Sequence, residues 1–341
     1  MIFGMMYDSQ PDVSVDEGRL LDRLQAGFPL VAEPYGCLAE ELELPAADVR
    51  TAIQHLRDSG VIRRIGASYV PARLGYVASL VAAEVCGEQI EVVAARANRC
   101  PGVTHNYERA GRLNLWFTVI AASTEQLHAT VSDVASADGV RRIHLLPALE
   151  TFKLRVQFRF AGEPSRPCPA LPSSPPQVPA TSASLDSVDK RLICRTCGDI
   201  GTGRMPYADM ADELGLARTD LLERLRAYRS EGRMRRFGAI LRHYTAGFAA
   251  NGMTVWNAPD ERAAEIGRHL AAPPEVSHCY QRPRLPDWPY NLYTMIHGRR
   301  ECEVRNLARR LAQDTGTTDF RILFSRREFK KASMVYFAEE F

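Results

Sequence analysis

Apolar residues recur at helical spacing in three successive stretches near the start of the chain. Each stretch keeps its apolar residues on one stripe of a helix: Leu20, Leu21 and Leu24; Leu38, Leu42 and Leu44; Val49, Ile53 and Leu56. Gly60 follows the third stretch, and the V-I-R-R segment after it predicts a short strand. Three short helices ahead of a strand are typical of a winged helix-turn-helix module.

A second pattern begins near residue 74 and alternates between strand-like and helix-like segments. It predicts, in order, a strand, a helix, a hairpin of two strands, a second helix and a closing strand: residues 74–85, 88–100, 102–121, 124–136 and 140–158. This β-α-β-β-α-β order is that of a ferredoxin-like sandwich.

The whole pattern is written twice. RDSGVIRRIGA (57–67) is answered by RSEGRMRRFGA (229–239), and THNYER (104–109) is answered by SHCYQR (277–282). A Pro- and Ser-rich stretch between the repeats shows no amphipathic period and predicts an extended linker. The chain is therefore expected to be an α+β protein of two tandem repeats, with helix-turn-helix modules at 14–70 and 188–242, ferredoxin-like modules at 71–160 and 243–341, and the linker at 161–187.

Composition places the protein among ordinary globular chains. Of 341 residues, 45% are hydrophobic and 25% charged, and the net charge of +2 argues against a surface built wholly for nucleic acid. We find neither an apolar run of about 20 residues nor a secretion signal, so we expect a cytoplasmic protein without membrane contact. The eight cysteines are then expected to be reduced; the Cys194/Cys197 pair has metal-site spacing but falls inside a predicted helix.

Polar side chains concentrate on the predicted hairpin of each repeat. His105, Tyr107 and Arg109 stand at alternate positions and should share one face of a strand. The second repeat presents the same three residue types at His278, Tyr280 and Arg282, although the residues between them differ. Either this face is solvated, or it binds a ligand, because burying three such groups without partners is costly. The recurrence in both repeats favours the ligand.

A helix-turn-helix followed by a ferredoxin-like module resembles the Lrp/AsnC transcriptional regulators. That resemblance leaves two hypotheses: a regulator that senses heme or an amino acid, or an enzyme that kept the architecture. The expected recognition helices do not exclude DNA, since 46–57 carries Arg50, Gln54 and Arg57, and 216–229 carries several arginines beside acidic residues. Two diverged halves in one chain suit an asymmetric ligand held between them, which favours the enzyme.

More specific motifs resemble the siroheme decarboxylases. Their G-V-T-H-N-Y-x-R and N-L-W-F-T stand at 102–109 and 114–118, and R-R-I-G-A stands at 63–67. L-G-Y stands at 74–76, and the terminal F-K recurs at 152–153 and 329–330. The resemblance spans nearly the whole chain outside the linker. The second half departs from it, with Cys279 for Asn, Tyr293 for Trp and an insertion at 283–289, so the equivalence of the two halves stays open.

The resemblance implies non-oxidative removal of two acetate carboxyl groups from siroheme, giving 12,18-didecarboxysiroheme on the route to heme d1 or heme. His105 and His278 would donate the protons, and one of them would also ligate the siroheme iron. The carboxylates would be bound by cationic side chains, supported by the tyrosines and by Trp116: Arg63, Arg64, Tyr107, Arg109, Lys153, Arg235, Arg236, Tyr280, Arg282 and Lys330. For Trp116 and Tyr293, packing in the core is the alternative.

The same reading sets expectations for cofactors and partners. No cofactor is expected beyond the iron of the substrate, because the conjugated macrocycle can delocalise the carbanion. The expected partners are siroheme, the other half of the same chain, a second copy in a homo-oligomer and other proteins of heme d1 biosynthesis, but neither DNA nor membrane. The remaining histidines show no sequence partners and are expected to be structural: His55, His144, His243 and His297.

Overall fold

The computed structural model describes residues 13–154, 160, 184–201, 203–242 and 250–341. It divides into two units that cut across the sequence repeat. Unit 1 comprises 1–70, 157–248 and 335–341, and unit 2 comprises 71–156 and 249–334. Each unit therefore collects like modules from both halves. The expected linker lies outside the described residues from 161 to 183, as does the start of the last module, with His243, from 243 to 249.

Unit 1 holds the predicted helices and strands of both helix-turn-helix modules. The first module contributes α1 (Val15–Ala26), α2 (Pro34–Leu42), α3 (Ala46–Asp58) and β1 (Ile62–Tyr69), and the second α6 (Ser187–Thr196), α7 (Pro206–Leu214), α8 (Arg218–Ser230) and β7 (Met234–Leu241). Both first helices begin at a capping box, Ser14 with Glu17 and Asp186 with Asp189. Matching caps at matching positions show that the repeat extends to the ends of its helices.

Two glycines sit at the centre of unit 1. Strands β1 and β7 are the wings of the two helix-turn-helix modules. They pair antiparallel, with Gly66 opposite Gly238, and form one small sheet. A Cβ atom on Gly66 would lie 2.2 Å from the carbonyl oxygen of Gly198, and one on Gly238 would lie 2.6 Å from that of Leu24. Each wing thus passes so close to the end of the other module's first helix that a side chain does not fit.

Unit 2 contains the two β-α-β-β-α-β modules, and the predicted fold class is confirmed. The first module comprises β2 (Val77–Val85), α4 (Ile90–Asn98), β3 (Val103–Arg109), β4 (Leu115–Ala121), α5 (Thr124–Ala135), β5 (Val140–Pro147) and β6 (Glu150–Leu154). The second comprises β8 (Ala250–Trp256), α9 (Ala263–Ala271), β9 (Val276–Gln281), β10 (Leu292–Gly298), α10 (Glu301–Thr315) and β11 (Phe320–Lys331).

The closing strands of unit 2 are shared between the halves. All its strands form one sheet in the order β5-β2-β4-β3-β11-β8-β10-β9-β6. The first part of β11 pairs with β8 of its own half, and the second part pairs with β3 of the other half. In the same way β5 pairs with β2, whereas β6 pairs with β9. Only Ala148 and Leu149 separate β5 from β6 at opposite edges, so the sheet curls round on itself.

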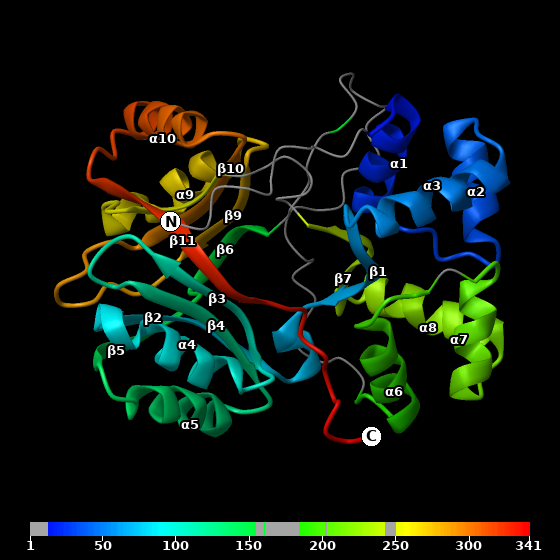
Figure 1. The fold of residues 1–341 in the computed structure, drawn as a ribbon, viewed down its shortest axis with the longest axis horizontal. Helices are drawn as coiled ribbons and strands as arrows, with labels where there is room; N and C mark the ends of the chain where they lie inside the picture. Colours follow the sequence, from blue (N-terminus) through cyan, green and yellow to red (C-terminus); the bar gives the residue numbers. More distant parts are fainter. Residues whose placement is uncertain (1–12, 155–159, 161–183, 202, 243–249) are drawn as a thin grey trace. The chain divides into compact units, whose positions relative to one another are not determined.

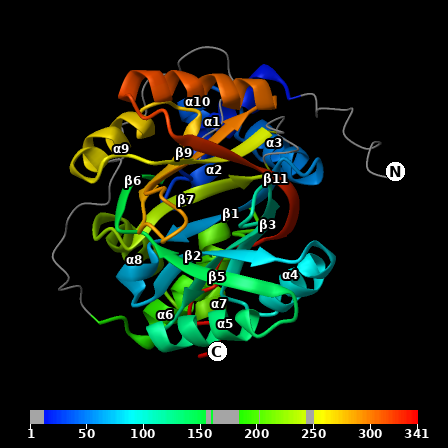
Figure 2. The same cartoon turned by 90° about the vertical axis from the view of Figure 1, so that its left-hand side faces the viewer.

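The helices of unit 2 cover the outer face of the curled sheet, and we call the opposite face the inner face. Because the sheet curls, Figures 1 and 2 show α4 and α5 on one side of the unit 2 strands and α9 and α10 on the other side. Each helix pair buries its own apolar cluster against the strands of its half. A third cluster, on the inner face, mixes residues of both halves and includes Trp116, Tyr293, Leu323 and Trp288. The halves are therefore joined by a common core as well as by exchanged strands.

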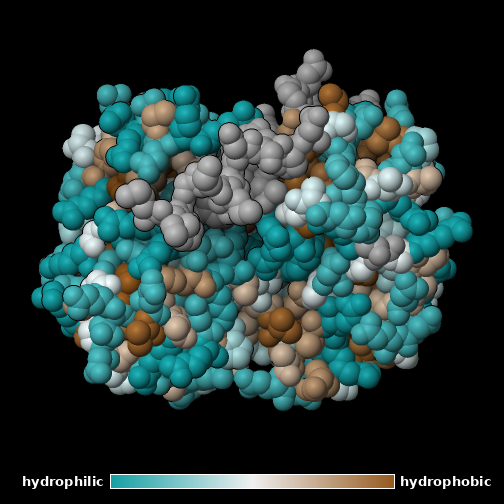
Figure 3. Space-filling view, in the orientation of Figure 1, coloured by the Kyte–Doolittle hydropathy of each residue, from teal (hydrophilic) through white to brown (hydrophobic). Residues whose placement is uncertain are grey.

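The exposed surface is mainly polar. Figure 3 shows a face of mostly hydrophilic residues with apolar ones scattered among them. The exposed large hydrophobic residues are spread along the described chain: Val15, Val92, Leu149, Val335 and Phe341. Among the described helices none combines the length and the apolar character that crossing a membrane requires.

Candidate active site

A β-bulge interrupts each histidine-bearing strand. On β3, Val103 pairs with Val119 and His105 with Thr118, so Thr104 is an extra residue. On β9, Val276 pairs with Ile296 and His278 with Met295, so Ser277 is extra in the same way. A bulge turns neighbouring side chains toward one side of a strand and is common beside active sites.

The bulges place a hydroxyl group beside each imidazole. Thr104 Oγ1 lies 3.0 Å from His105 Nδ1, and Ser277 Oγ lies 2.7 Å from His278 Nδ1. Gly102 permits this backbone path on β3, because a Cβ there would lie 2.1 Å from the carbonyl oxygen of Ile120. The sequence analysis missed both hydroxyl residues, and the Thr-His and Ser-His pairs at equivalent positions were the available clue.

The triad arginines are buried on the inner face. Arg109 is 2% exposed and donates from Nη1 to the carbonyl oxygen of Leu323 at 2.9 Å, while its guanidinium lies 5.1 Å from the Tyr107 ring centre. Arg282 is 8% exposed, donates to the carbonyl oxygen of Leu146, and lies 4.7 Å from the Tyr280 ring centre. Burial lowers the pKa of the Arg282 side chain. The interpretation of these residues as a solvated outer face is therefore wrong.

Each triad shares one face, as the alternation predicted, and the intervening residues face the helices. Asn106 donates to the carbonyl oxygen of Ala94 in α4 at 3.1 Å. The equivalent Cys279 donates to the carbonyl oxygen of Gly267 in α9 at 3.4 Å. Both histidines are half-buried, and their rings lie beside the tyrosine rings of the same triad. His105 is thus the most accessible member of the first triad, and in the second triad His278 and Tyr280 are both half-buried.

Two further basic groups on the inner face belong to the second half. Lys331 is the register partner of His105 on the neighbouring strand β11. His297 on β10 is half-buried, and its Nε2 lies 2.7 Å from Ser277 Oγ. The expectation that His297 lacks a partner is therefore wrong. The inner face gathers cationic and imidazole groups from both halves, an arrangement suited to an anionic ligand.

The F-K motif has a structural explanation. Phe152 and Phe329 are each the extra residue of a bulge and pack into the helix-side cores. The following lysine then points to the end of a helix: Lys330 Nζ donates to the carbonyl oxygens of Asn98 at 2.9 Å and Cys100 at 3.1 Å. Lys153 Nζ donates to the Pro273 carbonyl at 2.6 Å. Both lysines therefore cap helix ends on the opposite face, and their predicted role as substrate ligands stays a prediction that these contacts argue against.

Lys330→Met tests whether Lys330 caps a helix end or binds substrate. We expect the free energy of unfolding to fall by about 1–2 kcal/mol, because two carbonyl groups lose a charged donor, with KM unchanged. Chemical denaturation and steady-state kinetics measure the two quantities. Arg326→Met is the control, since Arg326 lies on the same strand with 63% of its side chain exposed, and it should change neither. A several-fold rise in KM for Lys330→Met alone would restore Lys330 to the binding site.

The arginine pairs of the wings divide into two kinds. Arg64 donates to the carbonyl oxygens of Gly198 and Ala67, each at 3.2 Å, and burial lowers its pKa. Arg236 donates in the same way to Gln25 and Ala239. These two arginines bind the wings to helix ends, which argues against their predicted role as substrate ligands but does not test it. Their neighbours Arg63 and Arg235 are half-buried and exposed, respectively, and stay predicted substrate ligands on unit 1.

Trp116 belongs to the inner-face core. It is 1% exposed, and its Nε1 donates to the Leu113 carbonyl at 2.7 Å. The 283–289 insertion adds Trp288, whose ring centre lies 5.8 Å from that of Trp116 and whose Nε1 donates to Tyr293 Oη at 2.9 Å. Asp287 in the insertion pairs with Arg112 at 2.9 Å and also with Arg142. For Trp116 and Tyr293 the core role therefore holds, and the insertion is clamped to the first half.

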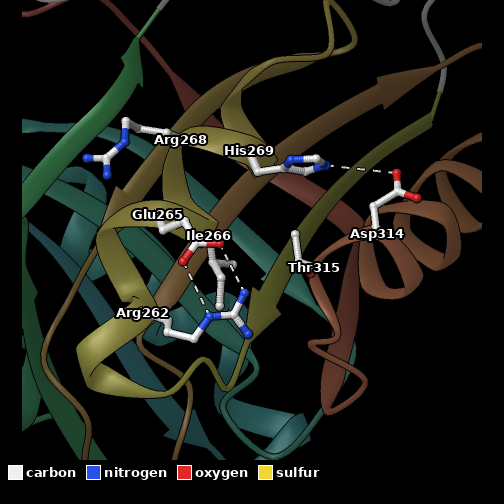
Figure 4. A pocket seen from close by; sticks show the side chains of 7 residues that line it. All are labelled: Arg262, Glu265, Ile266, Arg268, His269, Asp314 and Thr315. Atoms are coloured by element: carbon white, nitrogen blue, oxygen red, sulfur yellow. Dashed lines mark hydrogen bonds and ion pairs between the residues drawn. The ribbon is translucent and has the colours of Figure 1, made fainter.

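The other candidate sites offer less support for a catalytic or metal-binding role. Burial raises the pKa of Cys197 to about 11, which keeps it a thiol, and among the described residues no three His, Cys, Asp or Glu side chains gather as a metal site. His55 Nδ1 lies 2.6 Å from Glu17 Oε1, so the expectation that His55 lacks a partner is also wrong. A pocket of about 340 Å³ lies between α9 and α10, where His269 approaches Asp314 at 3.9 Å, on the outer side of the sheet (Figure 4).

Three of the arginines on the recognition helices are bound within unit 1, whereas Arg50 is exposed. Arg57 of α3 pairs with Asp199 at 2.9 Å. Arg224 of α8 pairs with Asp186 at 3.2 Å, and Arg226 donates to the Leu30 carbonyl at 2.8 Å. A DNA reader would direct such side chains toward phosphates and base edges. These contacts weigh against the regulator.

Comparison with known families matches both kinds of module. A model described as the AsnC-like ligand binding domain matches residues 73–153 and 245–330. A model described as the siroheme decarboxylase NirDL-like HTH domain matches residues 17–63. Fold and site together define an enzyme built from two fused AsnC-like halves.

Relatives extend the match to nearly the whole chain. A siroheme decarboxylase of Hydrogenobacter thermophilus is 35% identical over 95% of both chains, and a siroheme decarboxylase NirDL subunit of Paracoccus pantotrophus is 33% identical over 93% of this chain and 96% of that one. The crystal structure of the siroheme decarboxylase NirDL is 30% identical, covers 96% of each chain and has a TM-score of 0.71. A second crystal structure of NirDL, in co-complex with an iron-uroporphyrin III analogue, has a TM-score of 0.70. The chain belongs to the siroheme decarboxylase family.

Proposed function

We propose that this enzyme is a carboxy-lyase that removes two acetate carboxyl groups from siroheme. The product is 12,18-didecarboxysiroheme, an intermediate of heme d1 or heme synthesis. One observation carries the proposal beyond family membership: the inner face of unit 2 bears two imidazole-tyrosine-arginine triads on equivalent strands, together with Lys331 and His297. Siroheme has four acetate and four propionate groups, and a cationic face with proton donors suits such a polyanion.

The reaction needs little from the protein beyond binding and a proton. The bond between the acetate methylene and its carboxylate breaks, carbon dioxide leaves, and the electron pair stays on the methylene carbon, conjugated with the macrocycle. A proton from His105 or His278 then forms the new C–H bond of a methyl group. Lys331, the register partner of His105, joins the proposed carboxylate ligands of the inner face.

The roles of the triad arginines are better defined than in the sequence analysis. Arg109 and Arg282 each hold a carbonyl oxygen of the opposite half and a tyrosine ring of their own strand. We propose that they fix Tyr107 and Tyr280 and supply positive potential to the substrate carboxylates. No cofactor beyond the siroheme iron is invoked, and His105 or His278 is proposed as its axial ligand.

Pairing of the two halves is part of the proposed enzyme. A siroheme decarboxylase beta subunit of Methanosarcina barkeri, 40% identical, matches 44% of this chain over 99% of its own length. In this chain both halves contribute strands to one sheet. We further propose that the enzyme is cytoplasmic, forms homo-oligomers and contacts other heme d1 biosynthesis proteins. Sedimentation tests the oligomeric state, and affinity capture from the native cytoplasm tests the location and the contacts.

Anaerobic incubation of the purified protein with siroheme tests the activity. Chromatography with mass detection should show loss of two carbon dioxide units, through a species that has lost one. Siroheme that remains unchanged after prolonged incubation with excess enzyme would contradict the proposal. Unchanged siroheme together with tight, salt-sensitive binding to one DNA site would instead support the Lrp/AsnC-type regulator.

A further inference from the structure

A chain of hydrogen bonds links two histidines in the second half. His278 Nδ1 lies 2.7 Å from Ser277 Oγ, and the same oxygen lies 2.7 Å from His297 Nε2. The bulge on β9 makes this chain possible, because it turns Ser277 to the side of its neighbour. The Ser277 hydroxyl has one proton to donate, and its possible acceptors are His297 Nε2 at 2.7 Å and the Met295 carbonyl oxygen at 3.4 Å. The shorter contact favours donation to His297, which leaves His278 to donate to the serine oxygen.

The surroundings of His297 decide the direction of the chain. Burial lowers the pKa of His297 to about 4, and the charges of Lys331 on β11 and Arg109 on β3 add to the effect. His297 is therefore neutral at physiological pH and able to accept at Nε2. The chain then runs from His278 Nδ1–H to Ser277 Oγ, and from Ser277 Oγ–H to His297 Nε2, with the proton of His297 on Nδ1.

The first half is built differently at this point. Thr104 Oγ1 lies beside His105 Nδ1 at 3.0 Å, which repeats the first link. The second link is missing there, because Ile120 occupies the position of His297. Val119 pairs with Val103 in the first half, as Ile296 pairs with Val276 in the second. The residue that follows is Ile120 in the first half and His297 in the second. An isoleucine side chain has no acceptor.

We propose that Ser277 and His297 are positioning residues for His278, and that they make the imidazole of the second half the principal proton donor of the enzyme. The proposal rests on the proposed function and deepens it, since it assigns unequal roles to the two halves.

The chain keeps Nδ1 of His278 protonated throughout the reaction. Protonated His278 donates its Nε2 proton to the methylene carbon as carbon dioxide departs, and it remains neutral with the Nδ1 proton still bonded to Ser277. A proton from solvent then restores Nε2. Balanced over the cycle, one acetate group and one proton give one methyl group and one carbon dioxide. Fixing Nδ1 leaves only Nε2 for the transfer and holds the ring in place, so the proposed role of iron ligand falls to His105.

Few other titrating groups face His278 from the strands beside it. Strand β10 presents His297, and strand β6 places the apolar Leu154 opposite His278. Tyr280 lies next to it on β9, with ring centres 6.1 Å apart. The charges of Lys331 on β11 and Arg109 on β3 act on His297. A change in the pH dependence of turnover on removing Ser277 would therefore report on this chain.

Four variants test the proposal. Ser277→Ala removes the hydroxyl, and Ser277→Thr restores it with the residue type that the first half uses. His297→Ile installs the first-half residue, and His297→Gln keeps an acceptor. We expect kcat to fall about tenfold to a hundredfold for Ser277→Ala and His297→Ile, with KM within about twofold of the parent. Ser277→Thr and His297→Gln should retain most of the turnover.

The pH profile separates positioning from mere packing. A donor that must be protonated loses activity as pH rises, and a lost hydrogen-bond chain destabilises its protonated form. The alkaline limb of kcat should therefore move to lower pH in Ser277→Ala and His297→Ile, and stay in place in Ser277→Thr. Equal turnover and an unmoved limb in Ser277→Ala, or equal loss in Ser277→Thr, would overturn the proposal.

Imidazole NMR of the substrate-free protein provides a readout that does not depend on turnover. The parent should show His297 neutral with its proton on Nδ1, and His278 should titrate at lower pH in Ser277→Ala than in the parent. A His297 that carries its proton on Nε2 would overturn the chain. If the parent failed to decarboxylate siroheme while this NMR pattern was present, the proposed function alone would fail.

Discussion

Replacing both triad histidines is expected to lower kcat by about 10²–10⁴-fold, because general acid catalysis contributes about that much. In His105→Ala/His278→Ala neither triad keeps its imidazole, and the carbanion must take its proton from water. KM should rise as well, because one of these two histidines is the proposed ligand of the siroheme iron. Single-turnover assays with siroheme measure the rate, and circular dichroism checks the fold.

The single variants and a control complete this test. If the second half supplies the principal donor, His278→Ala should lose more activity than His105→Ala. His128→Ala is the matched control, because His128 is exposed on α5 and should leave kcat unchanged. Parent-like turnover in the double variant would remove histidine from the mechanism altogether.

Gly66→Ala is expected to destabilise unit 1 by about 1–3 kcal/mol or more, since overpacking a tight backbone contact costs this much. The new Cβ would stand 2.2 Å from the Gly198 carbonyl, which belongs to backbone and cannot rotate away. Gly238→Ala meets the Leu24 carbonyl at 2.6 Å and should be similarly destabilising. Urea denaturation followed by circular dichroism measures the loss.

Gly87→Ala serves as the control for the glycine variants. An added Cβ at Gly87 meets nothing within 4 Å, so the free energy of unfolding should stay within about 0.5 kcal/mol of the parent. Equal stability of Gly66→Ala and Gly87→Ala would show that the helix end beside the wing moves aside freely.

Periodic features were predictable from sequence because they depend on local spacing. The apolar stripes of α1 and α3, the strand-helix alternation of unit 2 and the tandem repeat all appear as expected. The shared face of each triad followed from strand alternation and holds in the structure. Family motifs then supplied the substrate class, which spacing alone does not reveal.

Features that depend on register were not predictable. A single extra residue in a strand reverses the side on which the next side chain falls. The bulge at Phe329 sends Lys330 to the helix end, and the bulge at Ser277 brings a hydroxyl to His278. The partner of His297 lies 20 positions away in sequence on a paired strand, so no local pattern announces it.

The exchanged strands make each half incomplete on its own. Strand β3 with His105 is bordered by β11 of the second half, and strand β9 with His278 is bordered by β6 of the first. Severing the chain between its halves would turn folding into a bimolecular event, with neither product able to satisfy its edge alone. A substitution in a shared strand of one half must therefore remain compatible with the strand of the other half beside it. This couples the evolution of the two halves even where their chemistry differs.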